Sequence, residues 1–144
     1  MTSTQFRLFL VLSLLSDAAT IAFEFAFQAS VPAQLTESIR TLRGQPSELK
    51  MLLGAVLGLI SIVMTLISAV GMYNFKVSAP KLALTSTIMG VLASTLLGAG
   101  LVSSITAALS FASTILWGSV LAIAHTSMYA GYSRATAKKL LSEA

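Results

Sequence analysis

Long runs of apolar residues alternate with short polar segments along this chain. Four runs are long enough for a helix that crosses a bilayer, which needs about 20 predominantly apolar residues. None shows the two-residue alternation that marks the strands of a membrane β-barrel. The pattern predicts a single domain of the all-α membrane class, a four-transmembrane-helix bundle with spans at about 6–28, 49–75, 82–102 and 105–132.

The longest connection, 31–48, carries a different pattern. Its apolar residues recur at helical spacing opposite charged ones, which predicts a short amphipathic helix on the membrane surface. An irregular polar loop is the alternative. Ser47 is expected to cap the start of the next span. The pattern places Leu35, Ile39 and Leu42 on one face, and Glu37 and Arg40 on the other.

The other two connections, 76–81 and the segment near Ser103 and Ser104, are short. Short connections predict antiparallel hairpins between the second and third spans and between the third and fourth. The first run also resembles a signal peptide, because Arg7 precedes a short apolar stretch. Since apolar character continues past Asp17 to Phe27, we expect a retained first span instead.

Composition excludes several classes of function. Apolar residues make up 56% of the chain and charged residues 10%, against about 25% charged in soluble domains. The chain has no cysteine, which excludes disulfides and thiolate sites. No catalytic motif or metal-ligand spacing occurs, so we expect neither an enzyme nor a metal or other cofactor. The net charge of +4 lacks the basic, aromatic-interleaved stretches of a nucleic-acid partner.

The basic residues predict the orientation. They are more numerous on the side that holds both termini, so these should be cytoplasmic and the long connection outside; an inverted or dual orientation is the alternative. The first side has Arg7, Lys76, Lys81, Arg134, Lys138 and Lys139, and the other has Arg40, Arg43 and Lys50.

Acidic residues inside the first apolar run are the main candidate for chemistry. Asp17 and Glu24 are seven residues apart and share one helix face with Ser13, Thr20 and Gln28. An acid at the centre of a spanning helix costs about 2.5–3.5 kcal/mol on the insertion scale. Three interpretations follow: a site for a proton, a cation or a polar ligand; a hydrogen bond that holds neighbouring helices together; or a contact with a basic residue of a partner protein.

His125 is the single histidine of the chain. It falls in the same half of the membrane as Asp17, so an Asp–His pair that relays protons is one hypothesis. The alternative is a histidine that hydrogen-bonds a hydroxyl or a carbonyl near the interface. One histidine without a second ligand does not make a metal site. The ligand-binding or ion-binding candidates are thus Asp17, Glu24, Gln28 and His125.

Small residues recur along three of the spans. Such residues let membrane helices approach closely, within one chain or between copies in a homo-oligomer. The candidate packing positions are Gly54, Gly58, Gly90, Ser94, Gly98 and Gly118.

The segments Gly71–Lys76, Ala79–Leu84 and Leu116–Ala122 resemble small bacterial four-span membrane proteins of unknown function. The resemblance implies the bacterial inner membrane and no activity. Small multidrug-resistance transporters are similar only in architecture, with four spans and an acid in the first. This chain departs from them in its two acids and in its single tryptophan, Trp117.

The leading hypothesis is a small inner-membrane protein, a transporter or channel, that handles protons, cations or a small amphipathic ligand through the acidic stripe. The alternative is a non-catalytic membrane subunit that scaffolds, protects or regulates a larger complex. The expected partners are the lipid bilayer and either further copies of the chain or a membrane partner protein.

Overall fold

The computed structural model describes residues 2–43, 47–97 and 103–143 and is all-helical over them. Four of its helices are long and apolar enough to cross a membrane, which confirms the all-helical class and four candidate spans. These four are α1 (Ser3–Ser30), α3 (Glu48–Tyr73), α4 (Ala79–Leu97) and α5 (Ser104–Ala124), and the shorter ones are α2 (Ala33–Arg43) and α6 (Ser127–Glu143).

The fourth spanning helix is shorter than the run 105–132 predicts. α5 ends at Ala124, and α6 begins at Ser127. The His125 ring lies 2.8 Å from the carbonyl oxygen of Leu121, and the Thr126 hydroxyl donates to the carbonyl of Ile123 at 2.6 Å. These side chains compete with backbone donors for the last carbonyls of α5, and the helix ends there.

The ends of α1 and α3 and the starts of α4 and α5 lie within three residues of the predicted ones, whereas the predicted end of the third span at 102 lies outside the described residues. Thr2 and Gln5 form a reciprocal capping box at α1, and the Ser47 hydroxyl accepts from the backbone N–H of Lys50 at the start of α3. Helix α2 occupies the long connection. Its amphipathic role stays a prediction, because the side chains of Ile39, Arg40 and Leu42 lie outside the described residues.

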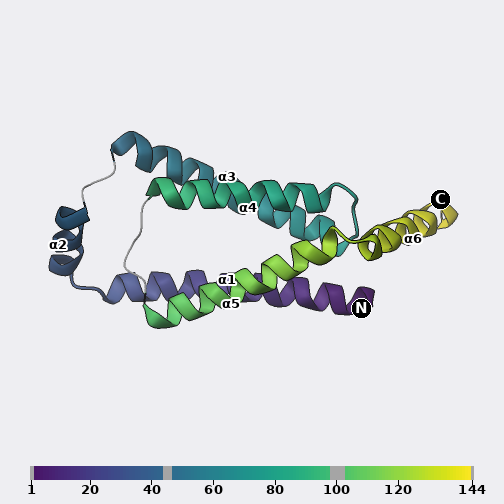
Figure 1. The fold of residues 1–144 in the computed structure, drawn as a ribbon, viewed down its shortest axis with the longest axis horizontal. Coiled ribbons are helices and arrows are strands. Elements are labelled where there is room, and N and C mark those ends of the chain that lie inside the picture. Colours follow the sequence, from purple (N-terminus) through teal and green to yellow (C-terminus); the bar gives the residue numbers. More distant parts are fainter. Residues whose placement is uncertain (1, 44–46, 98–102, 144) are drawn as a thin grey trace.

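The spanning helices form two antiparallel pairs, α3 with α4 and α1 with α5 (Figure 1). The pairs meet near the end that holds the start of α1 and α6, and they lie further apart toward α2 (Figure 1). The principal neighbour of α5 is therefore α1 and not α4, which we expected from the short connection. One contact between α4 and α5 is the Trp117 indole, which donates to the Thr87 hydroxyl at 2.9 Å.

Small residues bring α3 and α4 together. A Cβ added at Gly54 would lie 2.8 Å from Leu97, and one added at Gly90 would lie 3.0 Å from the Ser61 hydroxyl. The same hydroxyl donates to the backbone carbonyl of Ser86 at 2.8 Å. Close backbones and interhelical hydrogen bonds are the forces that associate helices in lipid. The contacts with α3 use the face of α4 that carries its small residues, and α5 therefore packs against α1 instead.

The turn after α3 has an unusual backbone. Phe75 has a φ of 54°, in the left-handed region that glycine usually occupies. The N–H of Lys76 bonds the carbonyl of Gly71 at 2.8 Å, and that of Phe75 bonds the carbonyl of Met72 at 3.0 Å. This is a Schellman motif with phenylalanine at the left-handed position. The strain, roughly 1–2 kcal/mol, requires compensation from packing.

An aromatic cluster provides that compensation and joins the two pairs. The Phe75 ring lies 5.3 to 5.7 Å from the rings of Phe6, Tyr129 and Tyr132 between centroids, and the Phe6 and Tyr129 rings are 5.5 Å apart. The Arg7 guanidinium lies 5.2 Å from the centre of the Phe75 ring. The Tyr129 hydroxyl donates to the carbonyl of Lys76 at 2.9 Å. The cluster thus links α1, the α3–α4 turn and α6.

Substituting Gly71→Ala should destabilise the protein by about 1–3 kcal/mol, the usual range for an overpacked core. The new Cβ would lie 2.8 Å from that of Ala79, where the end of α3 meets the start of α4. Gly118→Ala is the matched control, because an added Cβ there meets nothing within 4 Å. Unfolding by denaturant in detergent micelles measures both, and equal stabilities would contradict the close approach.

Substituting Tyr129→Phe should remove a late step from the alkaline titration of the tyrosines. Burial raises the pKa of Tyr129 from 10.0 to about 12. Because the folded protein holds this proton more tightly than the unfolded chain, the stabilisation is complete below pH 10 and is lost as pH rises through about 12. The difference in tyrosinate absorbance between wild type and variant should have its midpoint near pH 12, and a midpoint near 10 would contradict the burial.

Candidate functional site

One face of α1 changes from apolar to polar half-way along the helix. Positions that alternate by four and three residues face the rest of the chain, as in a coiled-coil seam. The first three are buried and the next four half-buried. In order from the N-terminus they are Phe6, Leu10, Ser13, Asp17, Thr20, Glu24 and Phe27, and we call them the α1 seam.

Asp17 contacts α5 directly. Its carboxylate accepts a hydrogen bond from the hydroxyl of Ser113, which is 4% exposed. The interaction joins residues 96 positions apart, so it is a tertiary contact between the two helices of the pair. The acid therefore lies in the α1–α5 interface, and its partner is a hydroxyl group.

Glu24 follows Asp17 on the α1 seam, seven residues nearer α2. Helices α1 and α5 are antiparallel, so seven residues forward on α1 correspond to seven residues backward on α5. Seven residues before Ser113 is Thr106, and Glu24 therefore lies about level with Thr106. Thr106 is 2% exposed and shares a hydrogen bond with Ser103 at 2.8 Å. The Glu24 carboxylate accepts from the side-chain amide of Gln28 at 3.4 Å. At 1.5 Å per residue, the two acids are about 10 Å apart along the helix.

Ser13 continues the polar part of the seam in the opposite direction. It is fully buried, and its hydroxyl has no hydrogen-bond partner among the described residues. One turn further along, Leu10 is 1% exposed, and Val120 of α5 is fully buried. The polar part of the seam thus stops at Ser13 against an apolar layer.

No basic side chain balances the two acids in the described part of the chain. The hydrogen bonds of Asp17 and Glu24 are to Ser113 and Gln28, and neither acid forms an ion pair there. The described residues also contain no group of three histidine, cysteine or acidic side chains that could hold a metal ion. What the seam offers is carboxylate and hydroxyl oxygens, which accept protons and coordinate hard cations.

His125 is remote from this site. It caps the C-terminus of α5, is exposed, and lies against the carbonyl of Leu121. Twelve residues separate it from Ser113, or about 18 Å along a helix. The structure therefore does not bring His125 to Asp17, and its contacts match the alternative of a histidine that bonds a carbonyl.

The other predicted positions divide in three ways. Gln28 is exposed at the end of α1, beside Glu24. Gly54, Gly58 and Gly90 face the α3–α4 interface, whereas Ser94 and Gly118 are exposed. The Ser94 hydroxyl donates to the carbonyl of Val91 in its own helix. Gly98 lies outside the described residues.

Ser113 and Thr106 of α5 are the site residues that the sequence pattern did not single out. Their seven-residue spacing equals that of Asp17 and Glu24, and this was the available signal. Using this signal requires knowing that α5, and not α4, lies beside α1.

Comparisons with protein-family models, with curated proteins and with solved structures find no match to this chain. The resemblance of its turn segments to bacterial four-span proteins therefore receives no support. The evidence on function is the seam itself.

A double-mutant cycle should measure the contact between Asp17 and Ser113. Asp17→Ala and Ser113→Ala each remove one partner, and the coupling should be about 0.5–2 kcal/mol, the range of hydrogen bonds between membrane helices. Asp17→Asn keeps an acceptor and should cost less than Asp17→Ala. Reversible unfolding in detergent micelles is the measurement.

The control cycle pairs Asp17→Ala with Thr114→Ala. Thr114 is exposed, and its hydroxyl donates to Ser110 in its own helix. Its coupling to Asp17 should be near zero. A coupling equal to that of Ser113 would mean that the two helices do not pack in this register.

Proposed function

We propose that this chain is a small four-span membrane protein that binds a proton, a small cation or a cationic amphipathic ligand at the α1 seam. The observation that supports the proposal is the placement of two carboxyl groups, Asp17 and Glu24, along an interface between spanning helices without an opposing basic side chain. Acidic residues in that setting mark ion pathways and proton-binding groups in membrane proteins.

Energetics favours a bound positive charge at this interface. A carboxylate at the centre of a spanning helix is costly, and one Ser113 hydroxyl satisfies only part of its capacity to accept hydrogen bonds. A proton or a cation removes the charge that makes the site costly. The hydroxyls of Ser113 and Ser13 add neutral oxygen atoms on either side of Asp17.

The arrangement suggests access from one side. Polar groups extend from Gln28 at the α2 end through Glu24 and Asp17 to Ser13, and buried apolar residues follow. A ligand would enter from the α2 end and meet Glu24 before Asp17. Passage across the whole membrane would need the layer of Leu10 and Val120 to open.

A subunit of a larger membrane complex is the second candidate. Gly118 and Ala122 are exposed one turn apart on α5, and a Cβ added at Gly118 meets no atom of the described residues within 4 Å. Small residues that face outward suit close approach by another helix. The mass of the intact complex from native membranes tests this candidate. A second protein in fixed ratio that is lost on Gly118→Leu would support it, and an unaltered homo-oligomer or monomer would contradict it.

Transport and binding assays in proteoliposomes test the leading proposal. Asp17→Asn should reduce proton flux, or uptake of a lipophilic cation, by at least about tenfold, since it removes more than about 1.4 kcal/mol of favourable interaction with the charge. Glu24→Gln should have a smaller effect, because this acid lies nearer the end of α1. Glu37→Gln is the matched control, an exposed acid on α2 outside the spans.

Two results would refute the leading proposal. One is wild-type protein that neither moves nor binds a proton or cation above the level of empty liposomes. The other is activity that Asp17→Asn and Glu24→Gln leave at the level of Glu37→Gln. Circular dichroism of each variant verifies that a loss of activity is not a loss of helix.

A further inference from the structure

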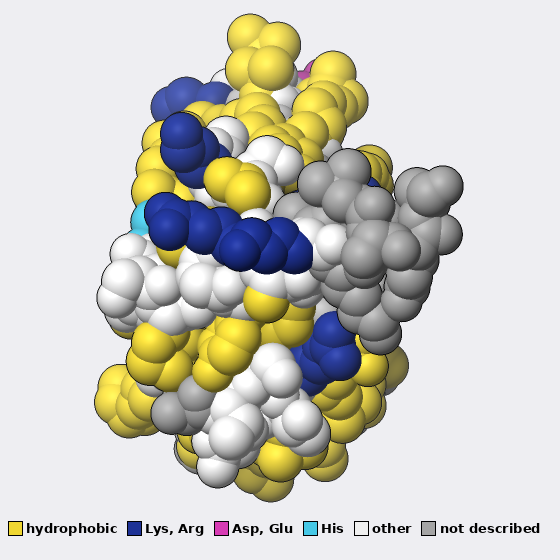
Figure 2. Space-filling model, turned by 90° about the vertical axis from the view of Figure 1, so that its right-hand side faces the viewer, with side chains coloured by type: hydrophobic (Ala, Val, Ile, Leu, Met, Phe, Trp, Pro, Cys, Tyr) yellow, Lys and Arg dark blue, Asp and Glu magenta, His cyan; other side chains and the backbone are white. Residues whose placement is uncertain are grey.

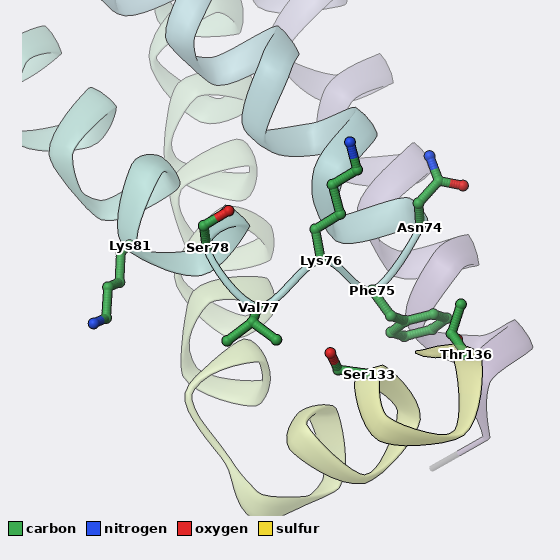
Figure 3. A pocket seen from close by; sticks show the side chains of 8 residues that line it. All are labelled: Asn74, Phe75, Lys76, Val77, Ser78, Lys81, Ser133 and Thr136. Carbon is green, nitrogen blue, oxygen red and sulfur yellow. The ribbon is translucent and has the colours of Figure 1, made fainter. Parts of the chain in front are cut away.

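A pocket of about 580 Å³ lies beside the turn between α3 and α4, at the opposite end from α2. Its walls come from this turn and from α6 (Figure 3). It is separate from the α1 seam and contains none of its residues. The lining residues on which the argument rests are Phe75, Lys76, Val77, Lys81, Ser133 and Thr136.

The polar lining has donors and positive charge but no acid. Lys76 of the turn and Lys81 of α4 lie on opposite sides of Val77, and in this conformation both side chains extend away from Ser133 (Figure 3). Both lysines are exposed, and long flexible stems let their ammonium groups reach a ligand at the rim. This side of the pocket suits an anion.

Ser133 gives the pocket an unused donor. The residue is only 8% exposed, yet its hydroxyl forms no hydrogen bond to another described residue. In Figure 3 the hydroxyl points from α6 toward the turn and into the pocket. Thr136 behaves differently, because its hydroxyl donates to the carbonyl of Tyr132 at 3.0 Å. The hydroxyl is the accessible part of an otherwise buried residue, and it is free to donate to a group bound in the pocket.

The remaining wall is apolar. Phe75 supplies an aromatic surface, and Val77, which is 77% exposed, projects between the two lysines. An exposed valine between cations suits the boundary between headgroups and acyl chains, where both kinds of surface have a partner. A ligand with an apolar part beside its anionic part therefore fits better than a free inorganic anion.

The position of the pocket specifies the source of that ligand. The spanning helices α3 and α4 end and begin on either side of the pocket, at Tyr73 and Ala79, so it lies at the level of the headgroups. Lys and Arg side chains spread across this end of the molecule (Figure 2), among them the exposed Arg134 and Lys138 of α6. Positive residues beside spans attract anionic phospholipids.

We infer that this pocket binds the headgroup of an anionic phospholipid. The Ser133 hydroxyl donates to a phosphate oxygen, Lys76 and Lys81 neutralise the charge, and the glycerol and first acyl carbons contact Phe75 and Val77. The lipid bridges the α3–α4 turn and α6, two elements that the Tyr129–Lys76 hydrogen bond already joins.

Lipid retention measured by native mass spectrometry tests this inference. The full chain is reconstituted in an equal mixture of phosphatidylglycerol and phosphatidylcholine, extracted in mild detergent and analysed for bound lipid. Wild type should retain phosphatidylglycerol in preference to phosphatidylcholine. Lys76→Gln and Lys81→Gln should each lower this retention about fivefold, the effect of one lysine near a lipid surface.

Two further variants separate a pocket from general charge. Lys50→Gln removes an exposed lysine at the α2 end and should leave the retention unchanged. Ser133→Ala leaves the net charge unchanged and should still lower the retention of phosphatidylglycerol. Val77→Asp places a negative charge, which repels the lipid phosphate, at the rim of the pocket. Because Val77 is exposed, the substitution leaves the core intact, and it should also lower the retention of phosphatidylglycerol.

Three outcomes would overturn the inference. The first is equal retention of the two lipids by wild type. The second is a loss of phosphatidylglycerol on Lys50→Gln as large as on Lys76→Gln. The third is inorganic phosphate that displaces the lipid and protects the protein from thermal unfolding as well as the lipid does, since this would identify a site for free anions.

Discussion

The Phe75 ring occupies the centre of the contact between the two helix pairs, and the backbone at Phe75 takes a left-handed conformation to place it there. The ring packs against Phe6 of α1 and Tyr129 of α6, while the residue itself belongs to the α3–α4 turn. Arg7 of α1 adds to this contact, because its guanidinium donates to the backbone carbonyl of Tyr73 at the end of α3 at 3.1 Å. The relative position of the two pairs therefore depends on a cluster at one end of the molecule and on the Trp117–Thr87 hydrogen bond.

The polar half of the seam and the aromatic cluster lie at opposite ends of α1, and this separation has a physical reason. Aromatic and large apolar residues exclude water and pack densely, so they close the end where the pairs meet. Toward α2 the contacts between the pairs are fewer, and carboxyl groups there are nearer to water and headgroups. Asp17 lies at the transition, with its Ser113 partner on one side and the buried Ser13 hydroxyl on the other. This position is where a bound proton or cation would change the interactions between α1 and α5 most.

The sequence pattern predicted four candidate spans from hydropathy, the capping role of Ser47 from its residue type at a helix start, and the shared face of Asp17 and Glu24 from their spacing. Each depends on residues close together in the sequence. The pattern did not predict the pairing of α1 with α5. The pairing depends on the contact of Ser113 with Asp17 and on the small residues that pack α4 against α3. Predicting it requires comparing the faces of different helices, which are far apart in the sequence. The end of α5 at Ala124 was missed because His125 and Thr126 bond local carbonyls within an otherwise apolar run. The left-handed Phe75 was missed because glycine is the usual residue there, and only burial of the ring favours phenylalanine.

The separation of 96 positions between Asp17 and Ser113 sets an order of events during biosynthesis. A ribosome adds roughly 5–20 residues per second, so α1 leaves it about 5 to 20 seconds before its hydrogen-bond partner exists. During that interval the α3–α4 hairpin can close, because its interface is local and complete. The acidic helix has no such partner and must be held by the insertion machinery or remain near the membrane surface. Release of α5 is then the step that completes the insertion of the first helix of the chain.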